Sequence, residues 1–179
     1  MIYLFIGGCR SGKSAAALQQ AKQFGADRKI FVATCQPQDA EMHARVERHR
    51  QERDATWETI EEPLEIAAIV HQHSGPQTVI LVDCLTLWLT NMIVQDADDA
   101  TISQRIATLE DALSNARGTV LLVANDVGMG IVPDNAMSRR FRDWAGSLNQ
   151  QMARCAREVI LTVAGIPVPI KTTTPKGRV

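Results

Sequence analysis

The sequence lacks the features that mark an exported chain, a membrane-spanning chain or a metal site built from paired cysteines. Its four cysteines are scattered, and no two of them have the paired spacing of a metal site. The apolar start Ile2–Ile6 runs directly into two glycines, so it is too short for the apolar part of a signal peptide. The best later apolar stretch, Leu85–Val94, contains polar residues and falls short of the roughly 20 residues of a membrane span. We therefore expect a cytoplasmic chain with reduced thiols.

An excess of charge of either sign is also absent. The chain has 19 Lys+Arg against 20 Asp+Glu, a net charge of −1, whereas a dedicated nucleic-acid binder needs a basic face. We therefore expect no nucleic-acid partner. Four arginines nevertheless crowd one short segment, which suits a small anion: Arg45, Arg48, Arg50 and Arg53. With 179 residues, 45% of them hydrophobic, the composition is that of one globular domain and excludes disorder and coiled coil.

Apolar runs alternate with helical patterns along the chain. The runs are β-branched or aliphatic and lack polar alternation, which is typical of strands buried on both faces. They lie at Ile2–Ile6, Lys29–Ala33, Thr78–Val82, Thr119–Ala124, Val159–Val163 and Val168–Lys171. The helical patterns lie at Ser14–Phe24, Asp39–Asp54, Leu64–Gln72, Leu85–Gln95, Ile102–Ala116 and Ala136–Arg157, and Gln95–Ala100 has the composition of a linker. This order predicts a single α/β domain over residues 1–179, with a mainly parallel sheet covered by helices on both faces.

A glycine-rich segment after the first predicted strand matches the phosphate-loop pattern G-x-x-x-x-G-K-[ST]. Its residues are Gly7, Gly8, Cys9, Arg10, Ser11, Gly12, Lys13 and Ser14. It follows a strand and opens a helix, which is the context that this motif requires. Backbone N–H groups and the helix N-terminus would hold phosphates, Lys13 would reach the β- and γ-phosphates, and the Ser14 hydroxyl would bind Mg²⁺. The alternative is a glycine-rich turn with an exposed lysine.

Two later strand ends carry acidic residues. Asp83 follows the run Val79–Val82, where a carboxylate would point into the crevice that holds phosphate-bound Mg²⁺. Its alternative role is to cap the helix that starts near Leu85. Asn125 and Asp126 follow the next predicted strand and are the weaker candidates for the same role.

The segment Asp39–Arg53 combines histidine with arginine at helical spacing. Met42, Val46, His49 and Arg53 lie on one stripe, and Arg45 and Arg53 flank His49. Fixed cations favour a neutral imidazole, which is nucleophilic through one ring nitrogen. Three glutamates could instead pair with the arginines on a solvated helix: Glu41, Glu47 and Glu52. From the residues alone, the solvated helix is the better supported of the two.

Taken together, the motifs resemble one known family across essentially the whole chain. The matching blocks are Gly7–Ser14, Asp39–Met42, Arg45–Arg50, Trp57–Pro63, Asn125–Pro133 and Phe141–Gln150. Their order is similar to that of the bifunctional adenosylcobinamide kinase/adenosylcobinamide-phosphate guanylyltransferase family of cobalamin biosynthesis. The resemblance implies a RecA-like P-loop sheet and a homotrimer. The chain departs from the expected pattern at Cys9, Cys35 and Asp126, where we expect Ala or Gly, Ser, and Glu, respectively.

The resemblance implies two reactions. ATP or GTP phosphorylates adenosylcobinamide, and GTP then gives its GMP to a histidine, from which GMP passes to adenosylcobinamide phosphate to form adenosylcobinamide-GDP. His49 matches the histidine that carries GMP, and Lys13 is the second implied catalytic residue. The implied metal is Mg²⁺, on Ser14 and Asp83. The implied nucleotide contacts are Gly7, Gly8, Cys9, Arg10, Ser11, Gly12, Lys13, Ser14, Ala33, Thr34, Cys35, Arg50, Gln51, Glu52, Arg53, Glu61 and Asp83.

The corrinoid needs a surface groove, and the loop Asn125–Pro133 is our candidate for one wall of it. Three alternatives remain. A P-loop small-molecule kinase would lack guanylyl transfer. A GTP-binding switch protein is disfavoured because the guanine-reading Asn-Lys-x-Asp is missing. A RecA-like motor on nucleic acid is disfavoured by the net charge.

Overall fold

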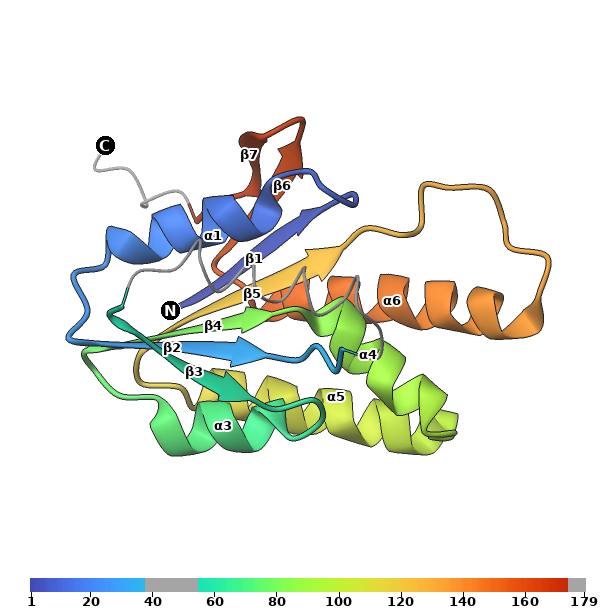
Figure 1. Ribbon diagram of the computed structural model, residues 1–179, viewed down its shortest axis with the longest axis horizontal. Coiled ribbons are helices and arrows are strands. Elements are labelled where there is room, and N and C mark those ends of the chain that lie inside the picture. The colour runs from blue at the N-terminus through green and yellow to red at the C-terminus, as the bar shows by residue number, and fades with distance from the viewer. Residues whose placement is uncertain (38–54, 174–179) are drawn as a thin grey trace.

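The computed structural model describes residues 1–37 and 55–173, whose strands form one sheet in the order β3-β2-β4-β5-β1-β6-β7 (Figure 1). Neighbouring strands are parallel except for the last pair, β6 and β7, which is antiparallel. The strands are β1 (Ile2–Gly7), β2 (Arg28–Ala33), β3 (Trp57–Glu61), β4 (Thr78–Asp83), β5 (Thr119–Asn125), β6 (Glu158–Val163) and β7 (Ile166–Lys171). This is the mainly parallel α/β sheet that the sequence predicts.

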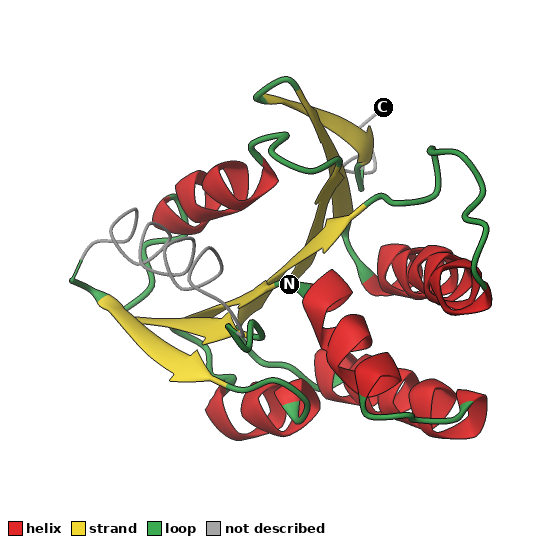
Figure 2. Ribbon diagram, turned by 45° about the vertical axis from the view of Figure 1, so that its right-hand side comes forward, coloured by secondary structure: helices red, strands yellow, loops and turns green. Residues whose placement is uncertain are grey.

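Helices cover both faces of the sheet, as predicted. Helix α1 packs on one face, and α3 to α6 pack on the other (Figures 1 and 2). The helices are α1 (Lys13–Lys22), α3 (Ile66–His73), α4 (Leu85–Val94), α5 (Asp99–Ser114) and α6 (Ala136–Cys155). Alternate residues of β1 serve the two layers, since Leu4 joins the core under α3 to α6 and Phe5 joins the core under α1. The central strands therefore need apolar residues on both sides, which explains their unbroken apolar runs.

Three differences from the sequence-based prediction have a clear position in the fold, and the ends of other helices and strands differ by one or two residues. Strand β3 was missed because only Trp57 and Ile60 of its five residues are apolar and its other three residues are exposed, as suits a strand at the edge of the sheet. Helix α5 begins within the predicted linker, because the Asp98 side chain accepts a hydrogen bond from the Thr101 N–H (2.8 Å) and caps it. Strand β7 begins at Ile166, two residues earlier than predicted. The predicted helix Asp39–Asp54 lies outside the described residues.

The parallel strands bring six distant parts of the chain to one edge of the sheet. The carboxyl-terminal strand residues there are Gly7, Ala33, Glu61, Asp83, Asn125 and Val163. Gly7 pairs in register with Asn125, and Ala33 pairs with both Asp83 and Glu61. Ligands of open α/β sheets bind at this edge. In the part of the chain that the structure describes, no helix has the length and apolarity to span a membrane.

Candidate nucleotide-binding site

The phosphate loop is built on two glycines that tolerate no side chain without rearrangement. A Cβ atom on Gly7 would lie 2.5 Å from the Thr162 carbonyl oxygen and 2.6 Å from Ser11 Oγ. Gly12 has φ +92°, and a Cβ there would lie 3.2 Å from the Cα of Gly165. The loop is thus pressed against the end of β6 and the turn that follows it. The glycines of the motif provide this close approach as well as the positive φ.

Hydrogen bonds close the loop and join it to the β6–β7 turn. The Ser11 N–H donates to the Gly8 carbonyl (3.3 Å), and the Gly165 N–H donates to the Ser11 carbonyl (2.9 Å). Lys13 is only 7% exposed, and its Nζ donates to the Gly8 carbonyl (3.1 Å). The alternative of a turn with an exposed lysine is therefore wrong. An ammonium has three donors, so Lys13 can keep this contact and still donate to a phosphate.

Helix α1 starts without a side chain over its N-terminus. Its N-cap is Gly12, which has no side-chain capping hydrogen bond, and its first turn carries no acidic residue. The N–H groups of a first helical turn have no partner within the helix and attract anions. Half-buried Ser14 stands in this turn, which brings its hydroxyl to the same end of the helix. The start of α1 is therefore suited to a phosphate group.

Three buried polar atoms around the loop have no hydrogen-bond partner among the described residues. They are Ser11 Oγ, Thr162 Oγ1 and Asn125 Oδ1. Thr162 and Asn125 lie at the ends of β6 and β5, the two strands that flank β1. Buried polar atoms are nearly always satisfied, so these three indicate a place where a ligand or water completes the structure. Sequence reasoning missed Thr162 and Gly165, which only the folded sheet brings to the phosphate loop.

Thr34 organises the neighbouring end of β2 and β4. It is fully buried, and its Oγ1 donates to the Cys84 carbonyl (2.8 Å) and accepts from the Cys84 N–H (2.8 Å). Its own N–H donates to the Asp83 carbonyl (3.2 Å), and its carbonyl accepts from Asn91 Nδ2 (2.8 Å). The polar groups of Thr34, a predicted nucleotide contact, therefore all form hydrogen bonds within the protein. Its neighbours Ala33 and Cys35 are half-buried at the sheet edge.

Asp83 ends β4 at the same edge and is half-buried. The N-cap position of α4 belongs to Cys84, so Asp83 stands one residue before the position that the capping alternative needs. Burial, and after it the charge of Asp83, raises the pKa of the Cys84 thiol to about 11. Cys84 is therefore a neutral thiol at physiological pH.

The remaining predicted residues divide into two groups. Exposed Glu61 ends β3, and the Glu62 N–H donates to the Ala33 carbonyl (3.0 Å), which keeps the ends of β2 and β3 together. Asp126 is occupied within its own loop, because its Oδ1 accepts from the Gly128 N–H (3.2 Å). The other group lies outside the described residues: His49, Arg50, Gln51, Glu52 and Arg53.

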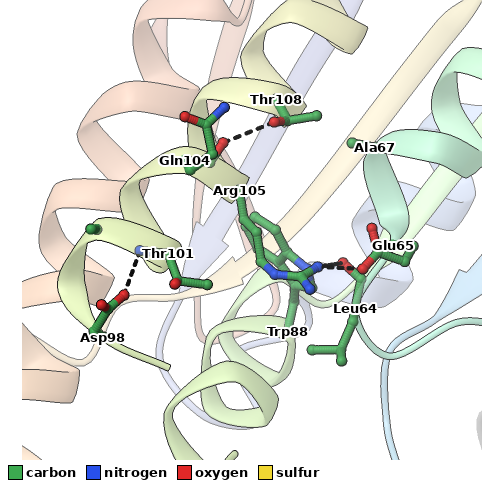
Figure 3. Close-up of a pocket in the computed structure, with 10 residues that line it drawn as sticks. Leu64, Glu65, Ala67, Trp88, Asp98, Thr101, Gln104, Arg105 and Thr108 are labelled. Carbon is green, nitrogen blue, oxygen red and sulfur yellow. Dashed lines mark hydrogen bonds and ion pairs between the residues drawn. The ribbon is translucent and has the colours of Figure 1, made fainter. Parts of the chain in front are cut away.

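A separate hollow of about 530 Å³ lies between α3 and α5 (Figure 3). Trp88 Nε1 donates to the Leu64 carbonyl (2.7 Å) at its base, and Arg105 forms an ion pair with Glu65 at its side. None of the catalytic, nucleotide-binding or metal-binding residues predicted from the sequence is among the described residues that line this hollow. The phosphate loop and the hollow are thus different places in the fold.

Comparison with known proteins relates the chain to one enzyme family. A family model described as cobinamide kinase / cobinamide phosphate guanyltransferase matches residues 3–170. The bifunctional adenosylcobalamin biosynthesis protein CobP of Pseudomonas aeruginosa is 43% identical over 168 residues, which are 94% of this chain and 96% of that protein. The corresponding CobU of Escherichia coli is 39% identical over 183 residues, covering 96% of this chain and 100% of that protein.

Solved structures show the same fold at low sequence identity. The RadB recombinase aligns with a TM-score of 0.54 at 13% identity, over 89% of this chain and 73% of that one. The flagellar accessory protein FlaH of Methanocaldococcus jannaschii aligns with a TM-score of 0.54 at 13% identity, over 96% of this chain and 78% of that one. At such identities the likeness concerns the fold alone.

Proposed function

Since the chain belongs to the cobinamide kinase / cobinamide phosphate guanyltransferase family, it is a bifunctional transferase, and we propose the following two reactions for it. ATP or GTP phosphorylates the hydroxyl of the aminopropanol arm of adenosylcobinamide. GMP from GTP then passes to adenosylcobinamide phosphate, which gives adenosylcobinamide-GDP for assembly of the cobalamin nucleotide loop.

One observation carries the kinase reaction: a buried Lys13 held to Gly8 beside the uncapped start of α1. Transfer of a γ-phosphoryl group to a hydroxyl needs alignment and neutralised charge, and it needs no covalent protein intermediate. Lys13 would donate to the β- and γ-phosphates, while the N–H groups of the first helical turn hold their oxygens. The three unsatisfied atoms around the loop support a ligand at this place.

Ser14 and Asp83 fit Mg²⁺ by their chemistry. Both offer hard oxygen ligands, and they stand at the start of α1 and at the end of β4. Mg²⁺ in nucleotide sites needs only one or two protein oxygens, because phosphates and water supply the others. The bound ion would neutralise charge on the phosphates.

The guanylyl transfer is proposed to pass through His49. A neutral imidazole nitrogen would attack the α-phosphorus of GTP, forming an N–P bond as pyrophosphate leaves. A phosphate oxygen of adenosylcobinamide phosphate would then attack the same phosphorus, which breaks the N–P bond and restores His49. Arg50 and Arg53 would offset charge on the triphosphate. The further nucleotide contacts proposed from the sequence are Gln51, Glu52 and Glu61.

Intact-mass measurement after incubation with GTP and Mg²⁺ tests the second reaction. We expect one covalently bound GMP, stable in alkali and released by mild acid, as for an N–P bond to histidine. His49→Ala should lose the adduct and the guanylyl transfer while it keeps the kinase reaction, and His43→Ala, about 120° away on a helix, should keep both. A chain that phosphorylates adenosylcobinamide but never binds GMP covalently would be a P-loop kinase without guanylyl transfer.

A homotrimer is part of the proposal, and the edge of the sheet supports contact between copies. Four apolar side chains of the β6–β7 hairpin are 44–64% exposed: Val163, Ile166, Val168 and Ile170. Apolar side chains gathered on an edge hairpin are typical of a protein interface. Sedimentation of the wild type should give a trimer, and Val168→Glu with Ile170→Glu should give smaller species. The cytoplasmic location remains a prediction from the sequence.

A further inference from the structure

We propose that the loop after β5 and the facing side of α6 form the subsite that binds the corrin ring of the substrate. This inference rests on the proposed function, since the corrinoid enters with it. The loop comprises residues 126–135, and the contributing part of α6 runs from Arg139 to Gln150. None of these residues belongs to the nucleotide site described above except Asp126, whose carboxylate is occupied within the loop.

The loop begins beside the phosphate loop. Asn125 pairs in register with Gly7, and the Asp126 N–H donates to the Gly7 carbonyl (3.0 Å). Figure 1 shows the loop leaving the tip of β5 and running beyond the sheet before it turns back into α6. A substrate that lies along the loop can therefore present one arm to the phosphate site and keep its bulk outside the sheet. This is the geometry that a small hydroxyl arm on a large ring requires.

The backbone of the loop is anchored while its apolar side chains face solvent. Arg142 Nη2 donates to the Gly128 carbonyl (2.7 Å), and Arg139 Nη1 donates to the carbonyls of Pro133 (3.0 Å) and Asp134 (2.7 Å). Three apolar side chains between these anchors are exposed: Met129 by 83%, Ile131 by 97% and Val132 by 62%. Exposed apolar groups clustered on a tethered loop indicate a surface that a ligand covers.

A hollow of about 610 Å³ separates the loop from α6. Gly128 and Val132 form its loop side, and the α6 side offers both donors and acceptors. The α6 residues are Arg139, Arg142, Asp143, Gly146, Ser147 and Gln150. Cobinamide is a broad ring with apolar faces and a rim of neutral amide side chains. The apolar Val132 side chain facing amide-binding groups of mixed charge fits that chemistry better than it fits an anion.

Gly146 supplies an independent reason to assign a ligand to the hollow. It stands inside α6, where glycine destabilises a helix by about 1 kcal/mol relative to alanine. Apart from the backbone of α6 itself, no atom of residues 1–37 and 55–173 lies within 4 Å of the position that its Cβ would occupy, so packing against this part of the chain does not require glycine there. Space left open for a ligand explains the residue.

Filling the hollow tests the inference. Gly146→Leu should weaken the binding of adenosylcobinamide by about tenfold or more and leave the KM for nucleotide within about twofold of the wild type. Equilibrium dialysis measures the corrinoid affinity, because the visible absorbance of adenosylcobinamide reports how much of it is bound. Thr108→Leu, which places the same side chain in the hollow between α3 and α5, is the matched control and should bind adenosylcobinamide like the wild type. A second variant, Ile131→Ser with Val132→Ser, changes exposed side chains only and should also weaken the corrinoid, whereas Val94→Ser, at an exposed valine of α4, should not.

The outcomes separate the inference from the proposed function. If the wild type phosphorylates adenosylcobinamide while Gly146→Leu and the double serine variant bind it normally, the subsite is wrong and the proposed function stands. Equal weakening of nucleotide and corrinoid, or weakening by Thr108→Leu alone, also overturns the subsite. If the wild type neither binds nor phosphorylates adenosylcobinamide, the proposed function is wrong and the subsite fails with it. If Gly146→Leu does not fold, the adenosylcobinamide affinity of Ile131→Ser with Val132→Ser tests the subsite instead.

Discussion

The phosphate loop and the loop 126–135 leave adjacent parallel strands at the same edge of the sheet, yet they are built in opposite ways. The first is short, Gly7 at its start is packed against Thr162 of β6, and Lys13 is buried. The second is longer, exposes Met129 and Ile131, and is anchored through its carbonyls by arginines of α6. A loop that binds a common chemical group can use its backbone. A loop that recognises one particular substrate must present side chains.

The largest expected effect belongs to the phosphate loop. Lys13→Ala should lower both the kinase and the guanylyl transfer rates by about 10²–10³-fold, because in the proposed function one buried cation would serve the phosphates in each reaction. Steady-state rates with adenosylcobinamide and with its phosphate measure this. Lys22→Ala, at the exposed end of the same helix, is the control. Retention of the guanylyl transfer by Lys13→Ala would mean that the loop serves the kinase reaction only.

The second prediction separates the buried glycine of the phosphate loop from its exposed neighbour. Gly7→Ala should lower the free energy of unfolding by about 1–3 kcal/mol, because its Cβ would meet backbone and side-chain atoms at 2.5–2.6 Å. The Cβ of Gly8→Ala would meet no atom of the described residues within 4 Å, its chain neighbours apart, and this variant should change the free energy of unfolding by less than about 0.5 kcal/mol. Urea unfolding of the two variants measures the difference. Equal losses would show that the packing against Thr162 does not matter.

The third prediction concerns the anchoring of the loop 126–135. Arg142→Met removes the hydrogen bond to the Gly128 carbonyl and should raise the KM for adenosylcobinamide about fivefold, while the KM for nucleotide stays the same. Arg154→Met, at the far end of α6, serves as the control. A rise in the nucleotide KM of equal size would indicate that the loop supports the phosphate site instead.

The smallest effect contrasts two cysteines by their reactivity. Cys9 is exposed in the phosphate loop, whereas burial raises the pKa of the Cys84 thiol to about 11. Since the thiolate is the reactive form, iodoacetamide at pH 8 should modify Cys9 well before Cys84. Bound nucleotide should slow the modification of Cys9, and adenosylcobinamide alone should slow it less. Mass mapping of the modified peptides checks both statements, and rapid labelling of Cys84 would contradict the first.

The motif and the central strands were predictable because their causes are local. A strand buried on both faces must be apolar throughout, so β1, β4 and β5 stand out in the sequence. The spacing of glycine and lysine in residues 7–14 reflects the shape of a phosphate group. This requirement is the same whatever other parts of the chain pack around the loop. Edge strand β3 escaped the same criterion because three of its five residues are exposed.

Hydrogen bonds between residues far apart in the chain could not be predicted, because no local sequence pattern indicates them. Three pairs of hydrogen-bonded residues could not be predicted from their positions along the chain. They are Gly165 with Ser11, Thr34 with Cys84, and Arg142 with Gly128. Each of these hydrogen bonds forms because the parallel strands bring distant segments to one edge of the sheet, where the β6–β7 turn and α6 also lie. Local spacing therefore specified the fold class and the phosphate loop. The bracing of that loop, the hidden role of Thr34 and the hollow beside α6 exist only once the sheet has assembled.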